Sequence, residues 1–287
     1  RFLPAPLNLN EYNTFNFSQN YENLDYRAKQ LWTEQFNWFV NYANTFGKHD
    51  VGGMIVFEQA ANGGEWVQAK GEQPLANIDQ MFNYSKDAER RWGDAEEYTG
   101  GRLSWIGRFN YTFDQKYIAE FSFRYDGNTL FPDGHRWGFF PSVSAAWRIS
   151  QEPFMEKTSD WLSNLKLRAS YGTTGNDLDL SKDPIDKITA FSYLQKYNTG
   201  GTYIFGSNLA NTITAGATPN PTLTWATSTT YNGGLDFGFF NNRLSGTFDA
   251  FYRKEVDILG PRTVTLPNTY GQSLAPENYA ERSWRGG

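Results

Sequence analysis

Apolar and polar side chains alternate along two neighbouring segments of the chain with the period of a β-strand. In residues 103–113, one face carries only apolar residues and glycine, and the other carries mostly polar residues, including Arg108. The same alternation restarts in residues 117–125, after the polar residues 114–116, which suit a tight turn. The two segments therefore predict an antiparallel β-hairpin.

The length and chemistry of this hairpin favour a membrane-spanning strand pair. Each arm holds about ten residues, more than the five or six typical of soluble proteins and enough to cross a bilayer when tilted. The apolar face is rich in aromatic rings and has no charge, whereas the opposite face carries Arg108, Glu120 and Arg124. Moving Glu120 and Arg124 to the lipid face would cost about 2–4 kcal/mol for the basic residue near the midplane and less for the acidic one. The pattern therefore specifies the register as well as the strands.

Further strands are predicted by the same alternation over most of the chain. They are expected at residues 29–46, 51–57, 136–150, 161–176, 225–239 and 244–254, with a weaker one at 12–18. Because a central strand tolerates proline poorly, Pro141 predicts a bulge or a late strand start. The tail from Leu259 onward shows no clear strand. An open barrel edge in lipid would leave unpaired backbone groups, so we expect the chain to be a fragment of a longer protein.

The predicted connections alternate in length. Short or compact ones are expected at 47–50, 114–116, 150–164 (with a short helix) and 241–242, and longer ones at 61–101, 127–137 and 174–222, with an excursion at 191–205. In outer-membrane barrels, short turns face the periplasm and longer loops face outward. This alternation assigns 61–101, 127–137 and 174–222 to the cell surface.

Composition supports aromatic-rich strands joined by polar loops. Aromatic residues make up 17% of the 287 residues, cysteine is absent, and mean hydropathy is low at −0.63. No run of about 18 apolar residues occurs, which excludes a transmembrane helix. The net charge of −5 and the absence of a Lys/Arg run give no reason to expect nucleic-acid binding. Without cysteine the chain forms no disulfide and carries no thiol chemistry.

The sequence offers little catalytic chemistry. The two histidines, His49 and His135, lie in separate turns and predict structural roles. A calcium loop starting at Asp126 would need glutamate at its twelfth position, where Trp137 stands, so ordinary loop turns are expected there. No phosphate loop, nucleophile elbow or metalloprotease motif occurs. Glu96 and Glu97 lie in a predicted loop, although acid/base pairs that form only in the fold stay open. We expect no enzyme, no cofactor and no metal site.

The charges predicted to face the barrel lumen are the candidate solute-binding residues. They are Arg108, Glu120, Arg124, Arg148, Arg168, Asp236 and Asp249, accompanied by Lys166 and Arg253. The favoured interpretation is that they pair with one another to build a polar interior and hold a plug; the other is that some line the solute path. Aromatic residues in the predicted loops suit either stacking on sugars or packing against a partner; they are Trp66, Trp92, Tyr193 and Tyr197.

A series of short motifs also carries a family resemblance. In order, the first block contains Ile106-Gly107-Arg108, Arg124-Tyr125-Asp126-Gly127, Arg136-Trp137-Gly138, Phe140-Pro141-Ser142-Val143-Ser144, Trp147-Arg148-Ile149, Glu152-Pro153-Phe154, Leu165-Lys166-Leu167-Arg168 and Ser170-Tyr171-Gly172-Thr173-Thr174-Gly175-Asn176. The second contains Asn220-Pro221, Leu223-Thr224-Trp225, Leu235-Asp236-Phe237-Gly238, Asn242-Arg243-Leu244-Ser245-Gly246 and Tyr252-Arg253-Lys254. In order and spacing these resemble the barrel of SusC/RagA-type TonB-linked outer-membrane proteins of the Bacteroidetes type.

The resemblance implies an all-β fold. Residues 1–287 would be about eight or nine strands of a larger antiparallel transmembrane β-barrel with long extracellular loops, in the Gram-negative outer membrane. The plug domain, the TonB box and the signal peptide are not visible in this chain. The implied activity is energised uptake of oligosaccharides or peptides delivered by a SusD/RagB-like surface lipoprotein, with energy reaching the plug through TonB.

Two other classes of protein stay open at this stage. A small closed outer-membrane barrel acting as a passive pore or anchor would also explain the alternation. A secreted all-β carbohydrate-binding module or adhesin would explain the aromatic content.

Overall fold

Antiparallel β-strands make up most of the computed structural model, which describes residues 7–9, 22–73, 91–179, 186–187, 191–206, 208–261, 267 and 271–287. The chain divides into two compact units, one formed by 1–36 with 60–101 and the other by 37–59 with 102–287. The long strands β2 and β3 each contribute to both units.

The bounds of the elements are as follows. The main strands are β1 (Leu7–Leu9), β2 (Glu22–Phe46), β3 (His49–Gln73), β4 (Arg91–Phe113), β5 (Tyr117–Asn128), β6 (Trp137–Arg148), β7 (Leu162–Asn176), β12 (Ala226–Phe239), β13 (Leu244–Gly260) and β14 (Glu277–Gly286). The shorter elements are the 3₁₀ helices η3 (Ile149–Gln151) and η4 (Pro153–Thr158), and the strands β8 (Leu178–Asp179), β9 (Asp186–Lys187), β10 (Tyr197–Phe205) and β11 (Asn208–Ala215). Among the residues described, no helix is long and apolar enough to cross a membrane.

The first unit contains β1 paired antiparallel with β2, followed in the sheet by the adjoining parts of β3 and β4. The loop expected over 61–101 is wrong for its described parts, because β3 continues to Gln73 and β4 begins at Arg91. Strand pairing through the backbone needs no apolar face where both faces meet water or polar groups. The hydrophobic alternation therefore fades in these segments while the strands continue.

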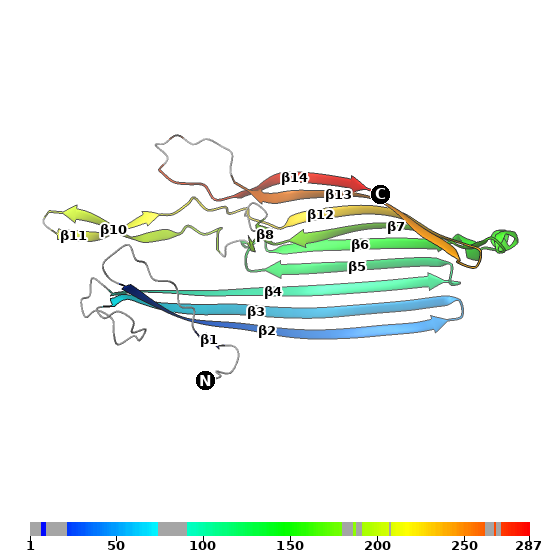
Figure 1. Cartoon of the computed structure of the whole chain (residues 1–287), viewed down its shortest axis with the longest axis horizontal. Coiled ribbons are helices and arrows are strands. Elements are labelled where there is room, and N and C mark those ends of the chain that lie inside the picture. Colours follow the sequence, from blue (N-terminus) through cyan, green and yellow to red (C-terminus); the bar gives the residue numbers. More distant parts are fainter. Residues whose placement is uncertain are drawn as a thin grey trace. The chain divides into compact units, whose positions relative to one another are not determined.

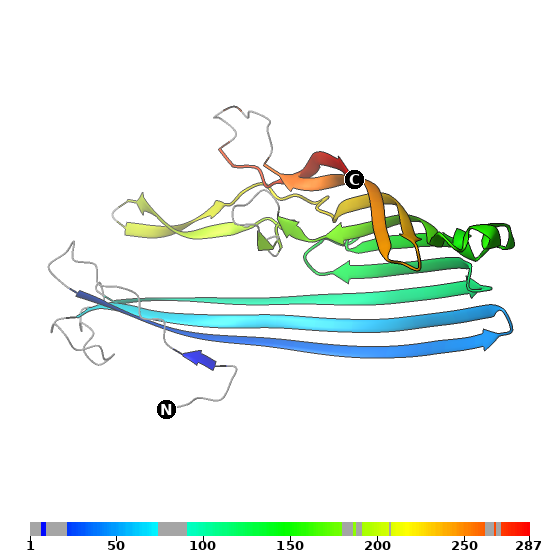
Figure 2. The ribbon, with the colours of Figure 1, turned by 45° about the vertical axis from the view of Figure 1, so that its right-hand side comes forward.

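In the second unit the sheet runs in the order β2, β3, β4, β5, β6, β7, β12, β13, β14. Strands β5, β6, β7, β12 and β13 lie side by side in Figure 1, and every register given between neighbours from β4 to β14 is antiparallel. In the turned view of Figure 2, the hairpin of β12 and β13 curves out of the plane of β5 and β6. This is the twist expected of paired strands.

The predicted hairpin of residues 103–125 is confirmed in strands, turn and register. β4 ends at Phe113 and β5 begins at Tyr117, with Trp105 opposite Tyr125 and Phe109 opposite Phe121. The turn between them has positive φ at Asp114 (50°) and Gln115 (55°). Two adjacent residues with positive φ form the type I′ geometry that matches the strand twist.

From β4 to β12 the sheet of the second unit has one apolar and one charged face, as the alternation predicts, whereas Lys254 of β13 and Arg285 of β14 add charges to the apolar face. Rings stand in rows across the strands of the apolar face, for example Tyr171, Tyr231 and Tyr252, which are opposite one another in register. These side chains stay solvent-accessible in the chain: Phe109 is 42% exposed and Phe139 55%. An exposed apolar surface that covers a whole sheet face marks contact with lipid or a partner rather than a soluble surface.

The connections of the second unit also follow the predicted alternation. Short turns join β2 to β3, β4 to β5 and β12 to β13, and the compact connection between β6 and β7 holds the expected short helix as η3 and η4. The connection between β7 and β12 is the long one. The excursion expected at 191–205 contains β10, whereas the partner strand β11 lies beyond it. The strand expected at 12–18 lies outside the described residues.

Pro141 does not interrupt β6, which already begins at Trp137, so both the predicted bulge and the predicted late strand start are wrong. The register with β5 runs without a break from Tyr117 opposite Trp147 to Gly127 opposite Trp137. Pairing of β6 with β7, however, begins only at Ser142. The N–H that Pro141 lacks is therefore at a position where β6 does not yet pair with β7.

The expectation of no strand after Leu259 is wrong, because β13 extends to Gly260 and β14 pairs with it. The sequence of β14 has no clean apolar alternation. Its partners are specified by charge and ring contacts instead: Arg282 Nε donates to Glu255 at 2.7 Å, and the Arg253 guanidinium lies 5.6 Å from the centre of the Trp284 ring. A search for alternating apolar residues overlooks a strand of this kind.

The assignment of the two faces is tested by a pair of neighbouring substitutions. Phe121 lies on the apolar face opposite Phe109 and Val143, whereas Ser122 lies on the charged face opposite Arg108. Phe121→Arg should impair assembly of the protein into the membrane, since a basic residue on the lipid face costs about 2–4 kcal/mol near the midplane. Ser122→Arg, at the same depth, should assemble well. The measurement is the heat-modifiable, membrane-assembled fraction; equal yields for the two variants would reject the assignment.

Candidate functional site

The charged face of the second unit is the candidate functional surface, and most of its predicted residues form ion pairs. Arg108 pairs with Glu120 at 2.7 Å across β4 and β5. Arg124 pairs with Asp126 at 3.0 Å and lies 4.0 Å from Glu58. Of these contacts, only the pair of Arg108 and Glu120 joins two of the predicted lumen charges, since neither Asp126 nor Glu58 was among them. Pairing lowers the cost of placing charges on a face that is only partly open to water.

A group of three charges on this face joins β7, β12 and β13. The Arg168 guanidinium donates from Nε to Asp236 at 3.0 Å and from its Nη2 to Asp249 at 3.2 Å. Arg168 is opposite Gly234, which is opposite Asp249, so the guanidinium crosses the backbone of β12 to reach β13. A Cβ at Gly234 would lie 2.5 Å from Asp249 Oδ1 and 2.8 Å from Arg168 Nη2. The missing side chain at Gly234 makes this close approach possible.

The remaining predicted charges lie elsewhere on the same face. Arg148 lies at the short-turn end, where its Nη1 donates to the Gln115 carbonyl at 3.3 Å. Lys166 is opposite both Arg148 and Asp236 in register. Arg253 belongs to a separate group near the long connections. The sheet thus spreads the predicted residues along its length and does not gather them into one centre.

A small apolar core covers the long-connection end of the sheet, and the alternation of side chains along the strands does not predict it. Phe131, Phe140, Leu223, Trp225 and Leu259 are buried together there. The Trp225 ring centre lies 4.8 Å from that of Phe131 and 5.5 Å from that of Phe140. The Trp225 indole donates to the Arg136 carbonyl at 3.1 Å. The motifs around residues 136–140 and 220–225 that carry the family resemblance meet here, and they were the available signal.

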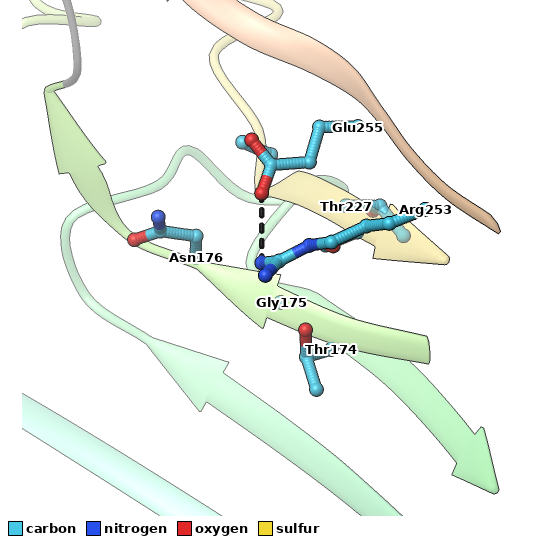
Figure 3. A pocket seen from close by; sticks show the side chains of 8 residues that line it. Thr174, Gly175, Asn176, Thr227, Arg253 and Glu255 are labelled. Atoms are coloured by element: carbon cyan, nitrogen blue, oxygen red, sulfur yellow. Dashed lines mark hydrogen bonds and ion pairs between the residues drawn. The ribbon is translucent and has the colours of Figure 1, made fainter. Parts of the chain in front are cut away.

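A polar pocket of about 130 Å³ lies next to this core. Residues of β7, β12 and β13 line it: Thr174, Gly175, Asn176, Ala226, Thr227, Ser228, Arg253 and Glu255. Figure 3 shows Arg253 extending across the pocket, with its ion-pair partner Glu255 on one side, Thr174 on the other and Asn176 beyond its guanidinium end. The predicted candidates did not include Glu255, Asn176 or Ser228, because a hydroxyl, an amide and a lone carboxylate carry no local sequence signal.

At the short-turn end of the sheet, a buried carboxylate holds neighbouring side chains together. Glu152, which is 8% exposed, accepts hydrogen bonds from the Tyr117 hydroxyl at 2.6 Å and the Trp147 indole at 2.9 Å. The Lys116 ammonium lies 3.7 Å from the same carboxylate. Hydrogen bonds from Tyr117 and then Trp147, aided by Lys116, lower the pKa of Glu152 below its ordinary value of 4.5.

Trp66, Tyr193 and His49, which are among the predicted loop aromatics and histidines, each contact side chains that lie near them in the fold. Trp66 is in β3, where its indole donates to Glu96 at 2.9 Å. The Tyr193 ring lies 6.2 Å from that of Phe191, and Tyr197 is 64% exposed. His49 Nδ1 lies 2.7 Å from the Tyr111 hydroxyl. The side chain of Trp92 lies outside the described residues. Within the described part of the chain, no three His, Asp or Glu side chains gather as metal ligands would.

A sheet with long antiparallel strands, a lipid-compatible face and a face of paired charges defines the wall of an outer-membrane β-barrel. The family model described as "TonB dependent receptor-like, beta-barrel" matches residues 5–284. The chain therefore belongs to the β-barrel family of TonB-dependent receptors, which are proteins of the outer membrane and form a transporter family rather than an enzyme family.

Individual relatives agree with this assignment. The TonB-dependent receptor SusC of Bacteroides thetaiotaomicron is 30% identical over 274 residues, covering 92% of this chain and 26% of that receptor. The TonB-dependent receptor P39 of Formosa agariphila is 29% identical and covers 97% of the chain and 26% of that receptor. A solved structure titled as the RagAB peptide transporter matches with a TM-score of 0.77 and 25% identity, over 92% of this chain and 28% of that one. The chain thus spans about a quarter of the length of these relatives.

Adjacent glycines test the crossing of β12 by Arg168. Gly234→Ala should destabilise the receptor by about 1–3 kcal/mol, because the added methyl displaces Arg168 and Asp249. Gly233→Ala is the matched control, since a Cβ at Gly233 meets nothing within 4 Å. Thermal unfolding of the two purified variants measures the difference. Equal midpoints would show that the close approach at Gly234 contributes nothing.

The Glu152 cluster predicts a dependence of stability on pH. Because folding lowers the pKa of Glu152, its contribution is present above the ordinary value of 4.5 and is lost as the pH falls through the lower folded value. Glu152→Gln should therefore remove part of the acid-induced drop in melting temperature. Glu156→Gln, at an exposed position of η4, should leave the drop unchanged. A parallel acid profile for wild type and Glu152→Gln would contradict the assigned role.

Proposed function

We propose that this chain is part of the barrel wall of a SusC/RagA-type TonB-dependent transporter that imports oligosaccharides or peptides. The observation that supports this proposal is the division of the sheet into an apolar face and a face of ion-paired charges within a TonB-dependent receptor barrel. The apolar face would contact lipid, and the charged face would border the solute path and the plug. In this proposal the chain has no catalytic role.

Further strands would complete the barrel in the parent protein. The strands at either end of the described sheet, β1 and β14, each have only one neighbour in the sheet order. In lipid, unpaired backbone groups are costly, so both edges call for additional partners. The plug, the TonB box and the signal peptide would belong to the remainder of such a protein.

The long connections would face the cell surface, where a SusD/RagB-like lipoprotein would deliver solute. The hairpin of β10 and β11 is the contact surface that we propose for this partner. Residues 197–215 contain no charged residue. Its side chains are strongly exposed, with Ile204 at 68%, Phe205 at 77% and Ile213 at 70%. A two-stranded hairpin with exposed apolar groups is marginally stable alone, which favours a protein surface that covers it.

Uptake experiments test the proposed transport. Import of a labelled oligosaccharide or peptide by cells that carry the receptor should require both the receptor and TonB. Uptake that persists without TonB would favour the alternative of a passive pore. A receptor that binds glycans on the cell surface but supports no import would favour the adhesin alternative.

Substitutions in the hairpin test the proposed lipoprotein contact. Phe205→Asp should reduce co-purification of the surface lipoprotein by about 10-fold, the effect expected for a buried interface residue. Thr202→Asp is the matched control, because it adds the same charge at another exposed position of β10. Co-purification of the lipoprotein at the wild-type level with both variants would place the contact elsewhere.

A further inference from the structure

The polar pocket beside the apolar core around Trp225 has the properties of a binding site for one chemical group. It lies mainly on the charged face, where Thr174 is opposite Ser228 and Ser228 is opposite Glu255. Its lining combines hydroxyl groups, the Asn176 amide, one guanidinium and one carboxylate. Its volume of about 130 Å³ is well below the roughly 300–1,000 Å³ of pockets that enclose a whole ligand. The pocket therefore suits one substituent of a larger solute.

The cation of the pocket is held in place before any solute arrives. Arg253 Nε donates to the Ser228 hydroxyl at 2.7 Å, and its Nη2 lies 2.8 Å from Glu255 Oε1. Arg253 nevertheless keeps 46% of its side chain exposed. A fixed but accessible guanidinium loses little conformational freedom when it binds an anion.

Two guanidinium groups share a single carboxylate at this place. Glu255, with 9% of its side chain exposed, accepts from Arg253 through Oε1 and from Arg282 through Oε2. Both carboxylate oxygens are thus occupied, and the group of three carries an excess positive charge. The nearby carboxylate of Asp177 is paired with Arg102. The Trp284 ring lies 4.7 Å from the Arg282 guanidinium and 5.6 Å from that of Arg253, which helps to hold both cations.

We propose that this pocket is a subsite for a carboxylate group carried by the transported solute. The inference rests on the proposed transport function and adds the charge of its substrate. One carboxylate oxygen would accept from Arg253, and the hydroxyl and amide groups of Thr174, Ser228 and Asn176 would donate to the other. Such a carboxylate has two sources, an acidic sugar or an acidic peptide side chain, and the shared chemistry is the charged carboxyl group.

The test compares solutes that differ only in charge. Binding of trigalacturonate and its methyl ester, and of tri-glutamate and tri-glutamine peptides, is measured by calorimetry on the full receptor. In one of the two pairs the acidic form should bind more tightly than its neutral counterpart. Arg253→Gln should weaken binding of that acidic form by about 10-fold or more and leave the neutral form unchanged. The pair that shows the difference identifies the source of the carboxylate.

A second variant and a matched control keep the test decisive if Arg253→Gln assembles poorly. Arg282→Gln leaves every lining residue in place but removes the excess charge, and it should also reduce the preference for the acidic form. Arg285→Gln is the matched control. Arg285 lies on the same strand as Arg282 but opposite Tyr252, on the other face of the sheet, so this variant should keep the preference for the acidic form. Equal binding of acidic and neutral forms, or binding of none of the four, would overturn the proposal. TonB-dependent uptake of a neutral solute would then leave the transport function intact and reject only the carboxylate subsite.

Discussion

Backbone hydrogen bonding in lipid is the constraint on which the rest of this sheet depends. Inside a bilayer every peptide group must find a partner within the protein, which only helices and closed barrels achieve. A strand in such a wall has one face in lipid and one toward the lumen, so its side chains must alternate. The rows of rings on one face and the ion pairs on the other are two results of this single requirement.

The charged face shows how a barrel interior carries many charges at low cost. Arginines reach carboxylates on neighbouring strands, and Arg168 reaches two because Gly234 leaves its path open. Such pairs join adjacent strands side by side and add to the ladder of backbone bonds. Where the numbers of cations and anions are unequal, as with Arg253, Glu255 and Arg282, a charge is left available for a ligand.

The parts of the fold that depend on alternation could be predicted from the sequence, and the parts that depend on pairing alone could not. The hairpin of 103–125, with its register, was predicted because a shift would move Glu120 and Arg124 into lipid. The extensions of β3 and β4 and the whole of β14 were missed, because polar strands need no apolar period. The pocket was missed as well, since Asn176, Ser228 and Glu255 meet only when three strands are placed side by side.

The buried core around Trp225 has a consequence for how proteins built on this sheet diversify. It fixes the start of β12 beside β7, so the chain leaves the sheet near Asn176 and returns near Trp225 at adjacent points. The ends of the long connection between β7 and β12 are therefore held together whatever lies between them. Closing a flexible loop of twice the length costs only about 0.6 kcal/mol more. This connection can be lengthened, shortened or replaced while the wall stays unchanged, which lets recognition evolve separately from the membrane-embedded scaffold.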